Sequence, residues 1–164
     1  GRIVNVASVL GRMGTPNCST YIMTKHAVEG YSDSLRLEMK SWGVKVCTVE
    51  PGNYSSGTKF FTTEGIKHWQ ELMWDKMSDD VKEDYGPESI QKFFAYFQLS
   101  MNLAVRNIQP VVNSMAEALT QKYPQARYCP QDLITRAAVT VVQHLPEVVS
   151  DNFSLLSLKL LKVI

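Results

Sequence analysis

Two short apolar segments, separated by one long helical segment, constrain the fold of this chain more than any other feature. Residues 3–7 form the first apolar run and residues 44–49 the second. From about residue 19 or 20 to residue 42, apolar side chains recur at intervals of three and four, the spacing of a helix. They are Val28, Tyr31, Leu35, Met39 and Trp42. Strand, helix and strand in this order predict a right-handed crossover in a parallel sheet.

This topology predicts where a ligand would bind. Ligands of open α/β sheets bind outside the carboxyl ends of the strands. Ser8 follows the first predicted strand, and Pro51-Gly52 follows the second. Tyr21 and Lys25 lie at the start of the intervening helix. We therefore expect these residues to meet at one edge of the sheet.

The residue types at this edge indicate proton chemistry on an alcohol or a ketone. Tyr21 and Lys25 are four residues apart and so share a face of the helix. A nearby ammonium favours the phenolate over the phenol, which prepares a tyrosine to exchange a proton with a substrate oxygen. Ser8 could donate a hydrogen bond to the same oxygen. Ser8, Tyr21 and Lys25 are therefore the predicted catalytic residues.

These motifs resemble those of the short-chain dehydrogenase/reductases. The resemblance rests on a strand that ends in Ser8, on Tyr21-x-x-x-Lys25, and on the strand 44–49 closed by Pro51-Gly52. It implies an α/β fold with a Rossmann-like, doubly wound parallel sheet. No Gly-x-Gly-x-x-Gly turn occurs in the sequence. We therefore expect the chain to be the carboxyl-terminal part of such a domain.

The resemblance also implies a nicotinamide cofactor and a set of residues around it. NAD is expected, and NADP stays open because the residues that read the ribose phosphate are not in this sequence. The implied cofactor-binding residues are Tyr21, Lys25, Pro51, Gly52, Asn53, Ser56 and Thr58. At Ser56 the sequence departs from the family pattern, because many relatives have a threonine five residues after the proline. Thr58, two residues further on, is the other implied hydroxyl. Ser8 is the implied residue that binds the substrate oxygen. A short carboxylate substrate would also need a cation, and Arg12, Lys59 and Arg127 are candidates for it by position alone.

The rest of the chain is expected to complete a single partial domain over residues 1–164. Residues 53–105 resemble the substrate lid of the family and contain a predicted helix over 64–77 and another from Pro87. A helix starting at Pro110 is predicted to turn Val112, Met115, Ala116 and Leu119 inward. Residues 126–129 are predicted to form a short strand. The apolar tail 147–164 fits a helix at a membrane interface better than one that crosses the membrane.

Two branches of the family compete as the closer resemblance. One acts on D-3-hydroxybutyrate and acetoacetate, and the other on retinol or hydroxysteroids. Residues 50–54, 73–74, 81–86 and 144–146 resemble the hydroxybutyrate branch. That branch implies a mitochondrial location, at the inner membrane or on the matrix side, and a phosphatidylcholine partner. The retinol branch implies the endoplasmic reticulum membrane.

Charge and cysteine spacing bear on the remaining classes of partner. A net charge of +1 gives no reason to expect nucleic acid as a partner. Cys18, Cys47 and Cys129 do not have the spacing of a zinc site, so no metal is expected. The family resemblance implies a homo-oligomer formed through the helix 20–42. The alternative is a catalytically inactive fragment that acts as an association or membrane-docking module.

Overall fold

The computed structural model describes residues 1–58 and 61–160 and divides the chain into two compact units. The first unit contains residues Gly1–Asn53 and Asn107–Ser150. The second contains residues Tyr54–Arg106 and Asp151–Ile164, and its first segment nearly coincides with the residues 53–105 that the sequence sets aside as a lid.

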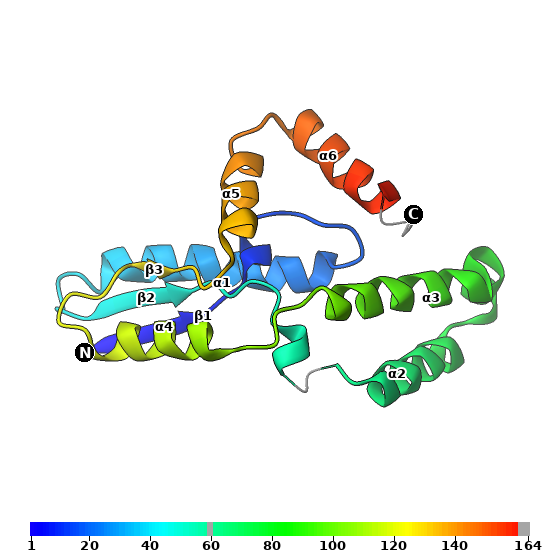
Figure 1. Cartoon of the computed structure of the whole chain (residues 1–164), viewed down its shortest axis with the longest axis horizontal. Coiled ribbons are helices and arrows are strands. Elements are labelled where there is room, and N and C mark those ends of the chain that lie inside the picture. Colours follow the sequence, from blue (N-terminus) through cyan, green and yellow to red (C-terminus); the bar gives the residue numbers. More distant parts are fainter. Residues whose placement is uncertain (59–60, 161–164) are drawn as a thin grey trace. The chain divides into compact units, whose positions relative to one another are not determined.

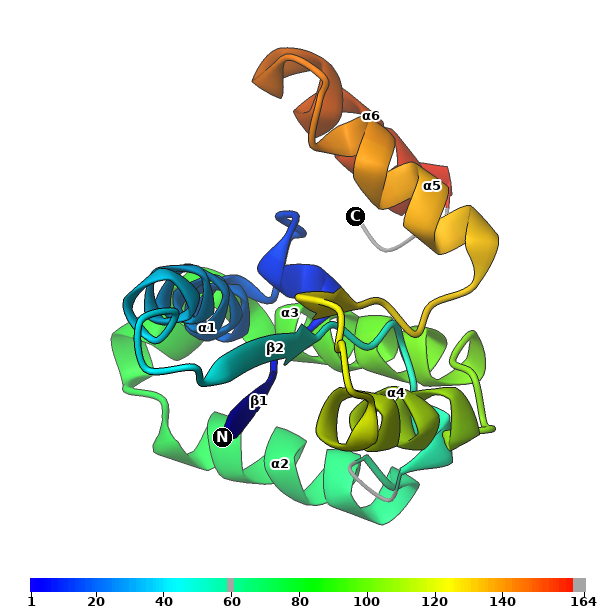
Figure 2. The same cartoon turned by 90° about the vertical axis from the view of Figure 1, so that its left-hand side faces the viewer.

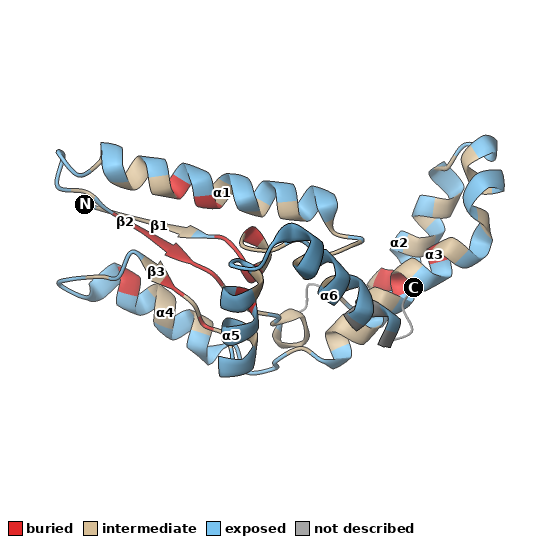
Figure 3. Cartoon of the chain, turned by 90° about the horizontal axis from the view of Figure 1, so that it is seen from above, coloured by how far each residue is buried: buried red, intermediate tan, exposed pale blue. Residues whose placement is uncertain are grey.

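The first unit is built on a parallel sheet of three strands (Figure 1). The strands are β1 (Arg2–Val6), β2 (Lys45–Val49) and β3 (Arg127–Tyr128), in the order β1-β2-β3. Cys47 and Val49 of the middle strand are 1% and 0% exposed, and the buried residues follow this strand in Figure 3. The predicted α/β class with a parallel sheet is confirmed.

Helices cover both faces of this sheet. Helix α1 (Ser19–Glu38) lies on one side of the strands and α4 (Gln109–Thr120) on the other (Figure 2). Ala118 of α4 is fully buried in a core with Cys47, Val49 and Tyr128. In addition, Arg2 Nη1 of β1 donates a 2.8 Å hydrogen bond to the Ala118 carbonyl. The sheet therefore holds α4 by apolar packing reinforced at the end of the helix.

The inward face of α4 differs from the prediction. Val112 and Leu119, predicted to point inward, are 45% and 56% exposed, and Ala116 is exposed as well. The helix turns Met115 and Ala118 toward the sheet instead. Met115 belongs both to the face that was predicted to point inward and to the face that does. Ala118, whose side chain is small, is the other residue of α4 that packs on the core of the sheet.

Helix α1 faces the sheet with polar side chains. Its buried residues are Glu29 and Ser32, and Asn5 Nδ2 donates a 2.9 Å hydrogen bond to Ser32 Oγ. Tyr31 and Trp42, which helped to predict the helix, are 60% and 77% exposed. The helix ends at Glu38 rather than at Trp42, and a turn follows with Gly43 at φ +64°. Periodicity thus located the helix without identifying its buried face.

Two further helices follow β3. Helix α5 (Leu133–Val142) begins at Asp132, whose Oδ1 accepts a 2.8 Å hydrogen bond from the Thr135 N–H. Helix α6 (Glu147–Leu160) occupies most of the apolar tail. Across residues 1–58 and 61–160, no helix combines the length and the apolar character needed to cross a membrane.

The second unit contains η2 (Ser55–Gly57), α2 (Thr63–Lys76) and α3 (Asp79–Asn102). Thr62 Oγ1 caps α2 by accepting a 3.0 Å hydrogen bond from the Gly65 N–H. Gly86, at φ 66°, interrupts α3, so the helix predicted from Pro87 is the second part of a longer element. Ile66, Ile90 and Phe94 form the core of the pair.

Candidate active site

Ser8 stands where β1 passes into the short helix η1 (Val9–Gly11). Its side chain is nearly buried at 8% exposure, and its Oγ accepts a 3.2 Å hydrogen bond from the Leu10 N–H. The pairing of β1 with β2 continues on both sides of Ser8, since Ala7 N–H donates to Val49 O at 2.8 Å and Val9 N–H donates to Pro51 O at 2.9 Å. These bonds hold Ser8 beside the turn that follows β2.

Tyr21 and Lys25 lie in the first turns of α1, and Lys25 reaches the end of β1. Lys25 Nζ lies 5.6 Å from the centroid of the Tyr21 ring. The same ammonium donates a 3.3 Å hydrogen bond to the carbonyl of Val6, the last residue of β1. The Tyr21 side chain remains 44% exposed. One ammonium thus joins the phenol-bearing face of the helix to the strand that leads into Ser8.

Gly11 sets how closely η1 approaches α1. A Cβ at this position would lie 3.0 Å from the Lys25 carbonyl oxygen and 3.0 Å from Glu29 Cγ. Real Cβ contacts are seldom that short, so a side chain at Gly11 would force its neighbours to move by a few tenths of an ångström. This close approach seats the turn after Ser8 directly against the segment of α1 that contains Lys25.

Pro51-Gly52 is held from the side of β3. Gly52 N–H donates a 3.3 Å hydrogen bond to Pro130 O, and Gln131 Nε2 donates a 3.0 Å hydrogen bond to Glu50 O. A Cβ on Gly52 would lie 3.4 Å from Gln131 Cγ. The backbone after β2 is therefore fixed at the edge of the sheet where Ser8 lies. Asn53, the next predicted cofactor residue, ends the first unit.

Three other predicted site residues make contacts of their own, and a fourth is not among the described residues. Arg12 follows η1, and its carbonyl accepts a 2.9 Å hydrogen bond from Gln143 Nε2. Ser56 and Thr58 belong to the second unit, where Ser56 Oγ donates to the Met101 carbonyl and Thr58 Oγ1 donates to Ser55 O at 3.3 Å. Lys59 lies outside the described residues.

A group of charged side chains, which we call the Arg127 cluster, joins α1 to the ends of β2 and β3. Its members are Arg127, Glu29, Asp33 and Glu50. Arg127 Nη1 donates to Glu50 Oε1 at 2.5 Å and also to Glu29 Oε2. Arg127 Nη2 donates to both Asp33 oxygens, at 2.5 and 2.6 Å. One guanidinium therefore binds three carboxylates.

Burial makes this cluster electrostatically unusual. The side chains of Glu29 and Glu50 are only 6% and 4% exposed. Burial raises the pKa of Glu29, and the negative charge of Glu50 adds to the rise against the hydrogen bond from Arg127. Burial opposes the charge of Arg127, but its hydrogen bonds to Glu50 and Glu29 raise the pKa of the guanidinium above its ordinary value.

The sequence analysis missed this cluster. It considered Arg127 only as a cation for the substrate, whereas the guanidinium already binds three carboxylates and is not available for that role. One signal was present in the sequence. Lys25, Glu29 and Asp33 follow one another at intervals of four, which aligns three charged side chains on one stripe of the helix.

Comparisons with known proteins agree with this geometry. Residues 1–66 match the family model described as short chain dehydrogenase. The chain is 38% identical to the mitochondrial D-beta-hydroxybutyrate dehydrogenase of Rattus norvegicus over 152 residues, which cover 93% of this chain and 44% of that protein. It is also 34% identical to retinol dehydrogenase 7 of Rattus norvegicus over 128 residues, which cover 78% of this chain and 39% of that protein.

A solved structure, a short-chain dehydrogenase from Streptomyces avermitilis, aligns with 99% of this chain and 51% of its own at 19% identity. Its TM-score of 0.44 is too low to carry an argument. Residues 1–66 thus match the short-chain dehydrogenase family, and the sequence relatives extend the similarity to dehydrogenases over most of this chain. The chain spans less than half the length of the curated relatives it matches.

The close packing around Gly11 predicts that alanine substitution changes the stability of the protein in opposite directions at Gly11 and at Gly30. Gly11→Ala should destabilise the protein by about 1–3 kcal/mol, because its methyl group must displace the backbone of Lys25. Gly30→Ala is the control. Gly30 is an exposed residue of α1 with open space around it, so alanine there should stabilise by about 0.5–1 kcal/mol. Urea unfolding of both variants measures the difference, and equal effects would contradict the proposed close approach.

The charge environment of Asp33 generates a prediction about pH. Burial acts to raise the pKa of Asp33, but the hydrogen bond from Arg36 and the charge of Arg127 outweigh it and lower the pKa. A lowered folded-state pKa contributes stability that is present above about pH 4 and lost as the pH falls through the folded-state value. Asp33→Asn should therefore be less stable than the wild type at neutral pH and approach it in acid.

Because Asp33 is 44% exposed, solvent screens this contribution, and we expect less than about 1 kcal/mol at neutral pH. Thermal unfolding of the two proteins across the acid range measures the difference. A stability difference that stays constant from neutral to strongly acidic pH would show that the carboxylate charge of Asp33 contributes nothing.

Proposed function

We propose that this chain provides the catalytic edge of an oxidoreductase that transfers a hydride between a nicotinamide cofactor and a secondary alcohol or ketone. The observation that carries the proposal is the position of Lys25. Its ammonium lies 5.6 Å from the Tyr21 ring centroid and bonds the end of the strand that leads into Ser8. An ammonium beside a phenol and a hydroxyl is the group of side chains that alcohol–ketone proton chemistry requires.

Each residue has a distinct role in this proposal. Tyr21 takes the proton from the alcohol during oxidation and returns it to the ketone during reduction. Lys25 stabilises the phenolate form of Tyr21 electrostatically. Ser8 donates a hydrogen bond to the substrate oxygen, for which its hydroxyl is suited because one Oγ lone pair already accepts from Leu10 and its proton remains available.

The donor set fits the nicotinamide end of a dinucleotide. When bound, the nicotinamide would accept or supply the hydride. Lys25 has three N–H donors and directs one to Val6, so further donors can bind ribose hydroxyls. Pro51 and Gly52 form a tightly held backbone turn beside Ser8, against which a flat ring could lie. NAD is the proposed cofactor, with NADP as the alternative, and Asn53, Ser56 and Thr58 remain proposed cofactor contacts.

D-3-hydroxybutyrate, with acetoacetate as its ketone, is the proposed substrate. The support comes from the 36–38% identity to D-beta-hydroxybutyrate dehydrogenases over 93% of this chain. A hydroxy acid also needs a cation for its carboxylate, and Arg12 and Lys59 are proposed for that role. By the same similarity we propose a mitochondrial location and a phosphatidylcholine partner. We also propose that two copies associate through α1, whose Tyr31 is 60% exposed.

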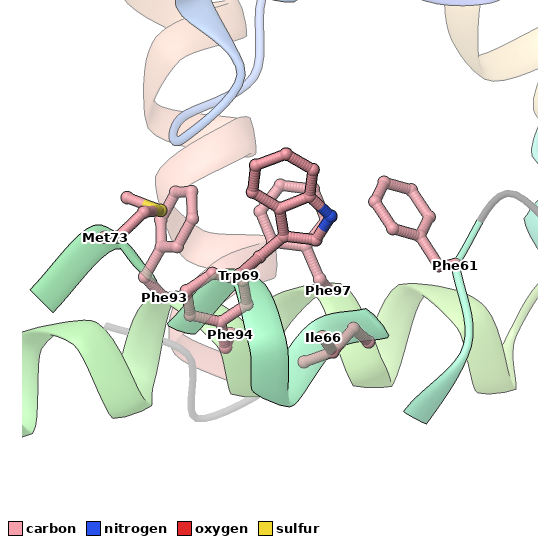
Figure 4. A pocket seen from close by; sticks show the side chains of 7 residues that line it. All are labelled: Phe61, Ile66, Trp69, Met73, Phe93, Phe94 and Phe97. Atoms are coloured by element: carbon pink, nitrogen blue, oxygen red, sulfur yellow. The ribbon is translucent and has the colours of Figure 1, made fainter. Parts of the chain in front are cut away.

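One observation favours a second candidate, a retinoid or hydroxysteroid. The second unit contains a pocket of about 390 Å³ between α2, α3 and the segment before α2 (Figure 4). Its lining is predominantly apolar: Phe61, Ile66, Trp69, Met73, Phe93, Phe94 and Phe97. Such a wall suits an apolar ring system or polyene better than a short carboxylate.

Substitution of Tyr21 tests the proposed proton transfer. Tyr21→Phe removes the proton-transferring group and should lower kcat about 10²–10⁴-fold, while the Kd for NAD stays nearly unchanged. Tyr123→Phe is the control, since Tyr123 is an exposed tyrosine outside the proposed site and outside α1. NADH formation measures kcat, and cofactor titration measures the Kd. Unchanged turnover in Tyr21→Phe would reject the mechanism, and failure of the wild type to bind NAD would favour an inactive association module.

A comparison of two alcohols distinguishes the proposed substrate, D-3-hydroxybutyrate, from the second candidate. NADH formation is measured with D-3-hydroxybutyrate and with all-trans-retinol, each in phosphatidylcholine vesicles. If the pocket binds the apolar substrate, Trp69→Ala should raise KM for retinol about tenfold, the effect of losing one large apolar contact. Tyr85→Ala, at an exposed aromatic residue of the same unit, is the control. Turnover of hydroxybutyrate alone, with no effect of Trp69→Ala, would reject the second candidate.

A further inference from the structure

The Arg127 cluster lies one helical turn from the proposed catalytic lysine. Glu29 is four residues after Lys25 and therefore occupies the same stripe of α1. On the sheet side, Glu50 directly precedes Pro51, whose carbonyl accepts from the residue after Ser8. Arg127 binds both carboxylates. It therefore connects the helix that carries Tyr21 and Lys25 to the strand end beside Ser8.

This connection matters because the fully buried side chains of α1 are polar, whereas its apolar residues Val28 and Leu35 are only half-buried. Its buried residues are Glu29 and Ser32. The hydrophobic effect is non-directional and follows the apolar area that is buried. A forked guanidinium bound to three carboxylates tolerates small displacements poorly, because its hydrogen bonds are directional and short. The position of α1 along the strands thus depends on polar contacts of defined geometry.

The cluster is not explained by stability alone. Two nearly buried carboxylates are expensive to desolvate, and an apolar replacement of similar volume is often equally stable or more stable. In addition, Glu29 Oε1 has no hydrogen-bond partner within residues 1–58 and 61–160. What such a cluster supplies better than apolar packing is a fixed relative position of the three elements that it joins.

We propose that Arg127 is a positioning residue, which holds α1 against the ends of β2 and β3 through Glu29, Asp33 and Glu50 and thereby fixes Lys25 and Tyr21 relative to Ser8. This inference rests on the proposed function, because it assigns Arg127 a part in the same reaction. Arg127 does not contact the substrate. Its effect belongs to the chemical step, since displacement by about 1 Å of a group that takes part in the reaction can lower the rate about 100-fold.

The main test compares two arginine-to-lysine variants of the purified protein. Arg127→Lys keeps the charge but loses the fork, so a single ammonium cannot bind all three carboxylates in the same geometry. We expect kcat to fall about 10- to 100-fold, with KM for the alcohol changed by less than about threefold. Arg36→Lys is the control, because Arg36 of α1 also bonds the sheet, through the Val46 carbonyl, but does not bond Glu29 or Glu50; its bond to Asp33 lies within the helix.

A pair of variants at Glu29 keeps the test decisive if Arg127→Lys fails to fold. Glu29→Gln and Glu29→Leu both remove the charge, but only glutamine keeps an oxygen that accepts from Arg127. Positioning predicts that Glu29→Gln retains kcat within about threefold and that Glu29→Leu loses at least about tenfold. Equal kcat in these two variants, or in Arg127→Lys and Arg36→Lys, would overturn the inference.

Amide hydrogen exchange over residues 19–29 separates this inference from the proposed function. Arg127→Lys should increase exchange in this segment, and Arg36→Lys should not. If the wild type turns over no alcohol with NAD or NADP, the proposed function is wrong, and exchange alone then decides whether Arg127 holds the start of α1. Identical exchange in Arg127→Lys and the wild type would overturn the positioning role whether or not the protein is active.

Discussion

The parallel pairing of β1 with β2 is the interaction on which the site depends. It extends beyond the strands themselves, because Ala7 N–H binds Val49 O and Val9 N–H binds Pro51 O. Ser8 lies between these two bonds, and its backbone is therefore held on both sides. Parallel strands end at the same edge of a sheet, so this pairing places the residues after β1 beside the residues after β2. Every other predicted catalytic residue is positioned relative to that edge.

Helix α1 meets this edge through a polar interface. Lys25 reaches the end of β1, Ser32 bonds Asn5, and Glu29 bonds Arg127. The apolar interface on the other face of the sheet, where Ala118 packs with Val49 and Tyr128, contributes hydrophobic stabilisation. The two faces thus differ in kind: apolar packing holds α4, whereas directional hydrogen bonds and ion pairs hold the helix that carries Tyr21.

The second unit shows a different arrangement, with aromatic side chains around an apolar pocket. Phe93 and Phe97 lie with ring centroids 5.0 Å apart, and Phe94 is buried beside them. This unit has its own core of Ile66, Ile90 and Phe94. This apolar pocket supports the second proposed substrate class, whereas the first rests on sequence similarity.

Local patterns predicted the elements well and their faces poorly. The strands, the start of α1 and the Pro87 and Pro110 helix starts all follow from periodicity, proline and apolar runs, which are properties of neighbouring residues. The buried faces do not. Val112, Ala116 and Leu119 point outward, and α1 buries Glu29 fully while Val28 and Leu35 of its apolar stripe are only half-buried, because a helix buries whichever side its neighbours cover.

The sequence alone determined the candidate chemistry, because Tyr21 and Lys25 share a helix face at any site where that helix forms, and because Ser8 directly follows a strand. Only the tertiary structure decided which distant residues support this chemistry. Arg127 is 98 residues from Glu29 and 77 residues from Glu50, and no local pattern links them. Their meeting depends on β3 pairing with β2 while α1 crosses the sheet, and those long-range contacts exist only once the chain has folded.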